Sequence, residues 1–135
     1  MSEELFKQMA QAVIDGEEED AAALAQQALD EGVAPLDAIN KGYAAGMDVV
    51  GELYTTGEYF LPDPILGGEA MKAALAVLEP ALKAAGQERE VLGKVVLGTV
   101  KGDIHEIGKS LVGTMLAANG FEVFDLGIDI ESSVF

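Results

Sequence analysis

The sequence contains no cysteine and only one histidine in 135 residues. The lack of cysteine excludes disulfide bonds and thiolate chemistry, and a single histidine argues against a zinc site built from protein ligands alone. Basic residues are also few, since 8 Lys and Arg oppose 24 Asp and Glu and the formal net charge is -16. Such an acidic surface repels phosphate backbones and anionic lipids, so neither nucleic acid nor a membrane is an expected partner.

Long apolar runs are absent as well, because Gly, Asp and Lys interrupt the hydrophobic segments, and no stretch predicts a membrane span. The amino terminus, MSEELFKQ, is acidic and helical in pattern rather than a signal peptide, which predicts a cytoplasmic protein. Residues 1–90 carry 18 acidic and 5 basic side chains, whereas residues 91–135 carry 6 and 3. We interpret the acidic helical faces as solvated surface rather than as a docking site.

Four apolar patterns with helical spacing occupy the first 86 residues. They run from Glu3 to Ile14, from Glu17 to Gly32, from Pro35 to Tyr54, and from about Pro64 to Ala85. Pro80 should kink or restart the last of these helices. Tyr59, Phe60 and Leu61 form an apolar cluster between the third and fourth patterns, and the pattern alone predicts that Phe60 and Leu61 staple adjacent helix ends.

A polar, glycine-led stretch follows and predicts a linker at residues 87–90. Beyond it, residues 95–100 predict a strand buried on both faces, residues 107–118 an amphipathic helix that ends at Asn119-Gly120, and residues 121–126 a second strand. These elements predict a right-handed parallel βαβ unit. Two strands and one helix cannot cover both faces of a sheet, so we expect the α/β part of this chain to be incomplete.

The loop KGDIHEIGKS joins the first predicted strand to the helix and holds the only histidine. Open α/β sheets place their ligands at this point, beyond the carboxyl end of a strand. The Gly-Lys-Ser ending invites comparison with a phosphate-binding loop, but five residues separate Gly102 from Gly108 where that loop needs four. The carboxylate of Asp103 would also repel a phosphate, so we reject a nucleotide site.

Three interpretations of Asp103 and His105 remain open on the residues alone. The carboxylate could orient the imidazole for acid/base catalysis, although no nucleophile or second acid accompanies the pair. His105 could instead ligate a metal through one ring nitrogen while Asp103 accepts from the other, and one protein ligand suffices if a macrocycle already holds the metal. A local capping or packing role for the histidine is also open.

The segment Asp103-Ile104-His105-Glu106-Ile107-Gly108, inside GTVKGDIHEIGKSLVGTMLAANGFEVFDLG, closely resembles the Asp-x-His-x-x-Gly signature of cobalamin-binding domains. Its surroundings are similar to the corrinoid proteins of methyltransferase systems and to the cobalamin module of methionine synthase. The likeness extends upstream through GEYFLPDPILGGEAMKAALAVLEP, which resembles the helical cap of that family. It covers essentially the whole chain.

The resemblance implies an α plus α/β architecture in three parts. Residues 1–86 would form an N-terminal four-helix bundle cap, residues 87–90 a linker, and residues 91–135 the first part of a Rossmann-like (flavodoxin-like) cobalamin-binding domain. Family members continue for several more strands and helices that enclose the cobalamin tail, and none of these is in the 135 residues. We therefore expect weak or no cobalamin retention by this chain alone.

The resemblance also assigns the site. Cobalamin or a related corrinoid would bind base-off, with His105 as the ligand of cobalt and Asp103 hydrogen-bonded to the far ring nitrogen. Gly102 and Gly108 would let the backbone approach the corrin and its nucleotide tail. The other cofactor-binding positions that the resemblance implies are Ile104, Glu106 and Ile107 in the signature, and Tyr54 and Leu61, which would shield the upper face of cobalt. That role replaces the stapling interpretation of Leu61.

The function that the resemblance implies is methyl transfer through cobalt, between Co(I) and methyl-Co(III). The chain would be a carrier rather than a stand-alone catalyst, without a catalytic residue of its own. Its expected partners are a substrate-specific methyltransferase, a second methyltransferase acting on a pterin or thiol, and a reductive activation protein. The cap would swing aside for each transfer, with the linker as hinge.

Two alternatives use related modules. A cobalamin-dependent sensor or regulator would share the cap and the binding domain, but the sequence has no basic helix that could bind DNA. A cobalamin mutase module is disfavoured, because the short cap lies close to the signature and no barrel is present.

Overall fold

The computed structural model describes residues 2–86 and 90–135, and the side chains of Ile107 and Leu111 lie outside that description. The chain divides into two compact units, the first ending at Arg89 and the second running from Glu90 to Phe135. Three of the four residues of the predicted linker, 87–89, lie outside the described residues. Each unit is therefore considered by itself.

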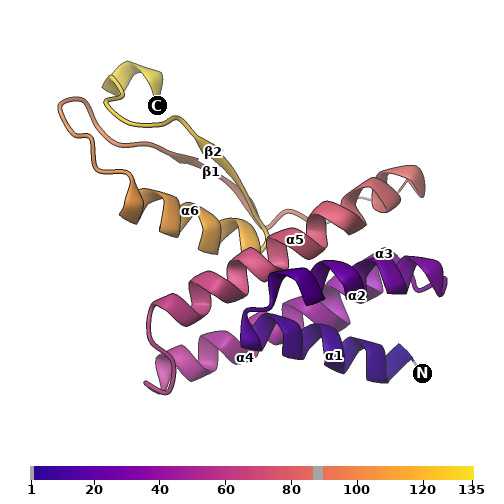
Figure 1. Cartoon of the computed structure of the whole chain (residues 1–135). Coiled ribbons are helices and arrows are strands. Elements are labelled where there is room, and N and C mark those ends of the chain that lie inside the picture. The colour runs from indigo at the N-terminus through magenta and orange to yellow at the C-terminus, as the bar shows by residue number, and fades with distance from the viewer. Residues whose placement is uncertain (1, 87–89) are drawn as a thin grey trace. The chain divides into compact units, whose positions relative to one another are not determined.

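The first unit is entirely helical (Figure 1). Its elements are α1 (Ser2–Asp15), α2 (Glu18–Asp30), the short α3 (Pro35–Asp37), the π-helix η1 (Ala38–Tyr43), α4 (Ala44–Thr55) and α5 (Pro62–Ala84). Acidic side chains fill the first turn of α2, where the helix dipole favours negative charge. No helix within residues 2–86 or 90–135 combines the length and the apolar character that crossing a membrane requires.

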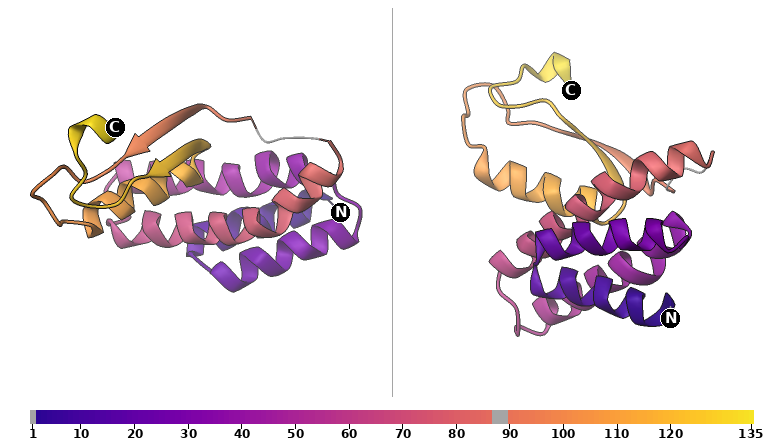
Figure 2. Two further views of the ribbon diagram at one scale, coloured as in Figure 1. Left: turned by 90° about the horizontal axis from the view of Figure 1, so that it is seen from above. Right: turned by 45° about the vertical axis from the view of Figure 1, so that its right-hand side comes forward.

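Small side chains set the spacing of the helices in this unit. Ala21, Ala25 and Ala28 of α2 are fully buried, and α2 packs along α5. Helix α1 packs against α4 through glycine, because a Cβ built on Gly46 would lie 2.6 Å from the carbonyl oxygen of Ala10. Figure 2 shows the helices of this unit side by side from two further directions. The core is thus made by close backbone approach as much as by large side chains.

The predicted single helix from Pro35 to Tyr54 is interrupted by a π-helix. The six residues of η1 take the wider i→i+5 turn, and α4 then continues the helical path. The turn buries the phenol of Tyr43, which donates to the carbonyl oxygen of Ala21 at 2.7 Å. The spacing of apolar residues could not predict the π-helix, because contacts with other helices accommodate the extra residue in its wider turn.

Helix α5 differs from its prediction at both proline positions. It begins at Pro62, two residues before the predicted start, and continues past Pro80 to Ala84 without a restart. Pro80 lies on the exposed side, whereas Leu78 and Leu82 on either side of it are buried. The packed leucines hold the helix together across the one backbone hydrogen bond that proline cannot make.

The second unit contains two parallel strands joined by a helix. Strand β1 (Gly93–Leu97) pairs with β2 (Phe121–Asp125) in the register Gly93–Phe121 to Leu97–Asp125, and α6 (Ile107–Ala118) makes the crossover. Beyond the strands, Val100 and Ile130 form an isolated parallel bridge, and a 3₁₀ turn, η2 (Ser132–Val134), follows. The observed architecture is therefore helical, with one small parallel sheet.

The sheet is covered on one face only among the described residues. A Cβ on Gly113 of α6 would lie 3.3 Å from the side chain of Leu97, so α6 covers the face that holds Leu97 and Val123. On the opposite face Val96 and Phe124 are 48% and 44% exposed. The prediction of a strand buried on both faces is wrong for the described chain. A continuous apolar run shows that a strand could be buried on both faces, but it does not show whether other elements cover them.

Candidate functional site

The loop between β1 and α6 carries the chemically distinctive residues of the second unit. Gly102 turns it with a φ of +85°, a conformation that favours glycine, and a Cβ there would meet nothing within 4 Å. The loop leaves the carboxyl end of β1 and enters α6 at Glu106, the N-cap residue, whose side chain makes no capping hydrogen bond. The predicted strand–loop–helix arrangement is confirmed.

Asp103 and His105 contact each other directly in this loop. The carboxylate oxygen Oδ1 of Asp103 lies 2.5 Å from Nδ1 of His105 and also accepts the backbone N–H of His105 at 3.0 Å. These hydrogen bonds, first the one from the backbone N–H and then the one from the ring, hold the pKa of Asp103 below its usual range. The carboxylate is thus kept ionised, and it fixes the orientation of the imidazole.

The remainder of the imidazole is open to solvent. The side chain of His105 is 93% exposed, and within the described part of the chain no hydrogen bond joins its Nε2 atom. A neutral ring that donates from Nδ1 to a carboxylate presents the lone pair of Nε2 outward. That nitrogen is therefore available as a ligand.

The residues that surround His105 do not form a metal site by themselves. Residues 2–86 and 90–135 contain no group of three or more His, Asp or Glu side chains placed to hold one ion. A single exposed imidazole backed by a carboxylate fits a metal that brings its other ligands with it, as in a macrocycle. The donor set on this loop is therefore compatible with a corrin-bound cobalt and unsuited to a bare divalent ion.

Two residues that the sequence analysis did not single out also hold this loop. The hydroxyl of Thr99 donates to the carbonyl oxygen of His105 at 2.7 Å, and Oδ1 of Asp129 accepts the N–H of Gly102 at 2.8 Å. The available signals were a threonine at the end of an apolar strand and an aspartate in the Gly-Ile-Asp turn after the second strand. Neither signal identifies its partner, which is six residues away for Thr99 and 27 residues away for Asp129.

A further pair ties α6 to the end of β2. The ammonium group of Lys109, whose side chain is only 6% exposed, lies 2.5 Å from Oδ1 of Asp125. The same oxygen accepts the N–H of Gly127 at 2.8 Å. The hydrogen bond from Lys109, followed by that from Gly127, lowers the pKa of Asp125. The pair secures the first turn of α6, directly behind the histidine loop.

The remaining predicted residues of the signature differ in surroundings. Ile104 is 75% exposed, Glu106 is exposed, and a Cβ on Gly108 would meet nothing within 4 Å. The side chain of Ile107 lies outside the described side chains. The open space at Gly108 means that its lack of a side chain is not required by packing within the described residues.

Tyr54 and Leu61 belong to the first unit, near the turn between α4 and α5. They are 49% and 52% exposed, and Phe60 is 72% exposed. The stapling interpretation is therefore wrong for Phe60, whose ring does not pack against a helix end. Tyr59 ties this turn down instead, because its hydroxyl donates to the carbonyl oxygen of Ile14 at 3.0 Å.

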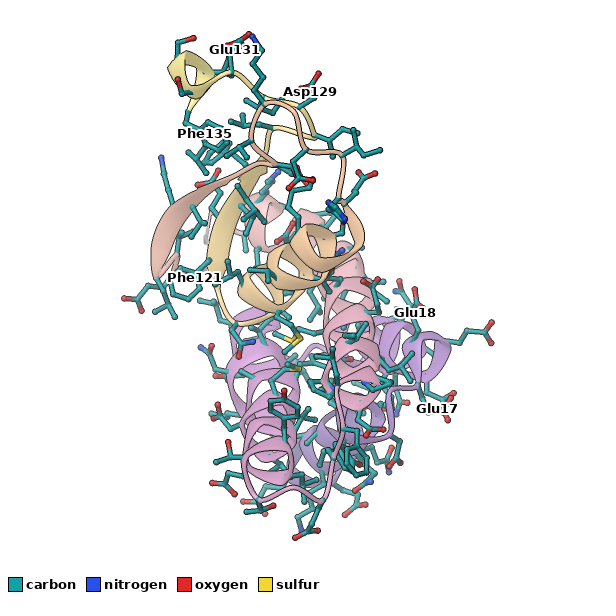
Figure 3. All side chains as sticks on the ribbon, turned by 90° about the vertical axis from the view of Figure 1, so that its left-hand side faces the viewer. Glu17, Glu18, Phe121, Asp129, Glu131 and Phe135 are labelled. Carbon is teal, nitrogen blue, oxygen red and sulfur yellow. The ribbon has the colours of Figure 1, made fainter. Side chains whose placement is uncertain are left out.

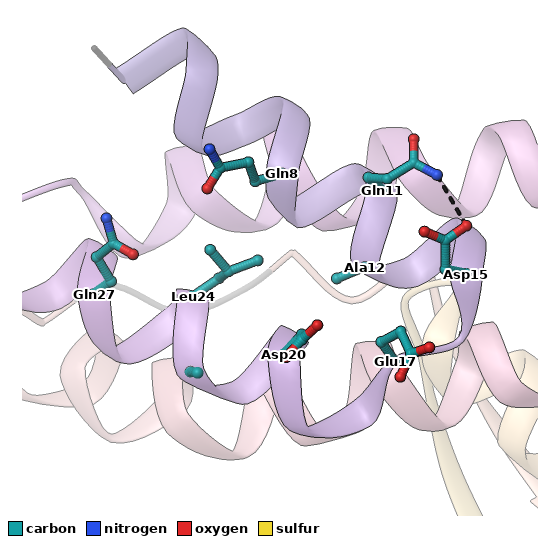
Figure 4. Close-up of a pocket in the computed structure, with 9 residues that line it drawn as sticks. Gln8, Gln11, Ala12, Asp15, Glu17, Asp20, Leu24 and Gln27 are labelled. Atoms are coloured by element: carbon teal, nitrogen blue, oxygen red, sulfur yellow. Dashed lines mark hydrogen bonds between the residues drawn. The ribbon is translucent and has the colours of Figure 1, made fainter.

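The hollows of the described surface include one in each unit. One, of about 430 Å³, lies beside the histidine loop and is lined by Val100, Lys101, Ile130, Glu131, Ser132 and Phe135. The other, of about 390 Å³, lies between α1 and α2 and is lined by amide, acidic and small apolar side chains (Figure 4). In it Gln11 donates to Asp15 at 2.9 Å, a contact within one helix. The second hollow holds no histidine or basic group.

Comparison with known proteins identifies related sequences over nearly the whole chain. A family model described as a B12 binding domain matches residues 5–79, which lie in the helical unit. A corrinoid protein of Desulfitobacterium hafniense is 47% identical over 132 residues, which are 97% of this chain and 61% of that protein. Trimethylamine corrinoid protein 1 of Methanosarcina acetivorans is 42% identical over 133 residues, 98% of this chain and 62% of its own length. The chain thus spans about three fifths of the length of these curated relatives.

Solved structures related to corrinoid proteins also match nearly the whole chain. The monomethylamine corrinoid protein of Methanosarcina barkeri matches 96% of this chain and 60% of its own, with 38% identity and a TM-score of 0.63. A chain of the methanol:cobalamin methyltransferase complex from Methanosarcina barkeri matches 94% of this chain and 48% of its own, with 36% identity and a TM-score of 0.82. These matches extend over the second unit as well, where His105 lies.

Proposed function

Because the chain belongs to the family described as the B12 binding domain, we propose that it holds a corrinoid and serves as the methyl carrier of a methyltransferase system. The observation that carries the proposal is the exposed imidazole of His105, oriented through Nδ1 by Asp103, in a chain whose described residues form no metal cluster. Relatives named as methylamine corrinoid proteins, and the solved methanol:cobalamin methyltransferase complex, support the methyl-transfer setting.

In this proposal His105 is the protein ligand of cobalt, through Nε2. When bound, the corrin supplies a metal centre that can accept and release a methyl group. The carboxylate of Asp103 accepts a hydrogen bond from Nδ1–H of the ring. This hydrogen bond raises the basicity of Nε2 and fixes the direction in which Nε2 points. The backbone N–H of His105 is the main group that keeps the carboxylate of Asp103 ionised. The carboxylate can therefore continue to orient the imidazole as a ligand without a neighbouring cation.

The glycines and apolar residues around this pair have supporting roles in the proposal. Gly102 and Gly108 leave open space beside the backbone, which suits the approach of a large flat group. Ile104, Glu106 and Ile107 complete the contacting segment. Tyr54 and Leu61 offer half-exposed apolar surface on the helical unit, and we assign them to shielding of the upper face of the bound group.

The proposed organisation assigns residues 1–86 to a four-helix bundle cap, residues 87–90 to a linker that acts as hinge, and residues 91–135 to the first part of a Rossmann-like cobalamin-binding domain. Opening of the cap would expose the carried group to a substrate-specific methyltransferase and then to a pterin- or thiol-dependent one. A reductive activation protein would restore the carrier after accidental oxidation. The catalytic groups of both transfers would belong to the partners.

The test is an equilibrium titration of the chain with hydroxocobalamin, followed by visible absorbance. We expect the parent chain to give the spectrum of a cobalt with an imidazole ligand, and His105→Ala to lose that spectral change at every cobalamin concentration. Lys101→Met serves as the control, since Lys101 forms an exposed ion pair with Glu131 on the surface. The same spectral change in the parent and in His105→Ala would overturn the ligand assignment.

Retention of the cofactor is a separate outcome of the same titration. We expect weak binding, because the chain spans about three fifths of the length of its curated relatives and the described residues cover only one face of its sheet. Tight binding by the 135-residue chain would show that these residues suffice for retention. Identification of the methyl donor then follows from the methyltransferase that co-purifies with the protein.

A further inference from the structure

The backbone of His105 is held by Thr99, at the end of β1. Thr99 is 8% exposed, and within the described part of the chain it is the only buried residue with a hydroxyl, amide or charged side chain other than tyrosine. Its hydroxyl donates to the carbonyl oxygen of His105 at 2.7 Å. Its own backbone is fixed on both sides, because its N–H donates to Gly127 and its carbonyl accepts from Ile130, each at 2.9 Å. Thr99 is thus a rigid point of attachment for the histidine.

Asp129 holds the same loop at a second point. Its N–H donates to the carbonyl oxygen of Asp103 at 3.2 Å, and its carboxylate accepts the N–H of Gly102 at 2.8 Å. It is the only non-glycine residue with a positive φ, +55°, in the described segments, a conformation that aspartate tolerates better than most residues. Figure 3 shows Asp129 at the loop end of the sheet, with Phe121 at the other end.

The direction of the imidazole depends on these two attachments. The ring is almost fully exposed, so packing cannot hold it in place. The short Asp103–His105 contact joins residues two apart and would move with the loop as a unit. The bonds to Thr99 and Asp129 fix that unit relative to the ends of β1 and β2 at the carbonyl groups on either side of Ile104, and the N–H of Asp103 adds a bond to the carbonyl oxygen of Val100 within the loop at 3.0 Å.

We propose that Thr99 and Asp129 are positioning residues, which fix the site of the His105 ring before any ligand arrives. The inference rests on the proposed role of His105 as the protein ligand of a corrinoid. A ring held in advance loses little freedom on binding, whereas a mobile ring must be ordered at the expense of affinity. The loss of one such hydrogen bond should weaken the ordered state roughly two- to tenfold.

The single histidine makes a direct test possible. Labelling only histidine with ¹⁵N gives one backbone amide signal and one pair of ring nitrogens, all from residue 105. Thr99→Val removes the hydroxyl but keeps the shape, and Thr99→Ser keeps the hydroxyl. In the ligand-free chain, we expect Thr99→Val to raise the amide exchange rate of His105 roughly two- to tenfold and to increase the motion that relaxation of the ring nitrogens reports. Thr99→Ser should restore both signals.

The controls separate positioning from general damage. Lys101→Met removes an exposed ion pair with Glu131, between the same two loops, and should leave both histidine signals as in the parent. Asp129→Gly keeps a residue that tolerates a positive φ but lacks the carboxylate, and Asp129→Asn keeps an oxygen acceptor. If Thr99→Val does not fold, the two Asp129 variants test the inference instead. We expect Asp129→Gly to make His105 more mobile and Asp129→Asn to leave it ordered.

Parent-like histidine signals in both Thr99→Val and Asp129→Gly would overturn the inference. Equal changes in Thr99→Val and Thr99→Ser would overturn the part assigned to the hydroxyl. Titration with hydroxocobalamin distinguishes this inference from the proposed function. Binding by the parent and equally by folded Thr99→Val refutes positioning alone. Binding by the parent and equally by His105→Ala, alongside mobilised histidine signals in Thr99→Val, refutes the ligand role of His105 and leaves the positioning intact.

Discussion

A methyl group added at Gly46 should force α1 and α4 apart. The Cβ of Gly46→Ala would lie 2.6, 2.9 and 3.1 Å from backbone atoms of Ala10, and a backbone cannot rotate out of the way as a side chain can. Restoring an ordinary contact of 3.4 Å requires a shift of about 0.8 Å along the helix pair, and a gap of this size forfeits a quarter to a half of each dispersion contact. Overpacking of this kind costs about 1–3 kcal/mol.

Gly51→Ala supplies a matched control in the same helix. A Cβ on Gly51 would meet nothing within 4 Å, so the substitution should stabilise by about 0.5–1 kcal/mol through helix propensity alone. The two variants should therefore differ by about 1.5–4 kcal/mol. For a unit of this size that corresponds to a separation of roughly 6 °C or more in Tm.

The assay is thermal and urea unfolding followed by circular dichroism at the helical band, with the parent and both variants measured together. Tyr54 lies in the last turn of α4, so a displaced α4 should also change the environment of that side chain, which tyrosine fluorescence can report. Equal stability of Gly46→Ala and Gly51→Ala would refute the close approach of α1 and α4, and with it the account of the helical core.

Tyr43→Phe should destabilise the helical unit by about 0.5–1.5 kcal/mol in urea titrations, since it removes the buried hydrogen bond to Ala21, and Tyr59→Phe should cost less because its bond is only partly buried. Burial raises the pKa of Tyr43 above its ordinary value of 10, so the stability it contributes is complete below pH 10 and is lost as pH rises toward the higher folded value. The urea midpoint of Tyr43→Phe should accordingly fall less steeply than that of the parent above pH 10. The pKa of Asp103 should remain below 3.8 in His105→Ala, because its main cause is a backbone N–H that the substitution keeps, and carboxyl NMR titration measures it. Lys109→Met should raise the pKa of Asp125 toward 3.8, although the N–H of Gly127 still lowers it. The stability that Asp125 contributes above 3.8, and that is lost as pH falls through the lower folded value, should therefore be smaller in the variant, as carboxyl NMR and acid titration can measure.

Local sequence patterns predicted the regular elements well. The first helix was expected from Glu3 to Ile14 and runs from Ser2 to Asp15, and the helix of the second unit runs from Ile107 to Ala118 as expected. Glycines with positive φ end α1 and α2, as their positions predicted. These features are local, because a helix and its termination depend on side chains within a few residues of one another.

The interruptions of those elements were not predictable in the same way. The π-helix before α4 and the continuation of α5 past Pro80 each depend on what packs against the helix from elsewhere in the chain. Buried contacts of Tyr43 favour the π-helix, and those of Leu78 and Leu82 favour an unbroken α5. Local helix propensity alone favours a regular helix in the first place and a break in the second.

The same division applies to the candidate site. The sequence by itself determined the loop, its place between strand and helix, and the pair Asp103 and His105, because their two-residue spacing places both side chains on one short turn. Only the tertiary structure decided that Thr99 and Asp129 anchor the loop. The Gly102–Asp129 contact, for example, joins positions 27 apart and arises beyond the paired ends of β1 and β2. Hydrogen bonds between distant segments depend on how the strands pair, and a linear pattern of residue types does not contain that information.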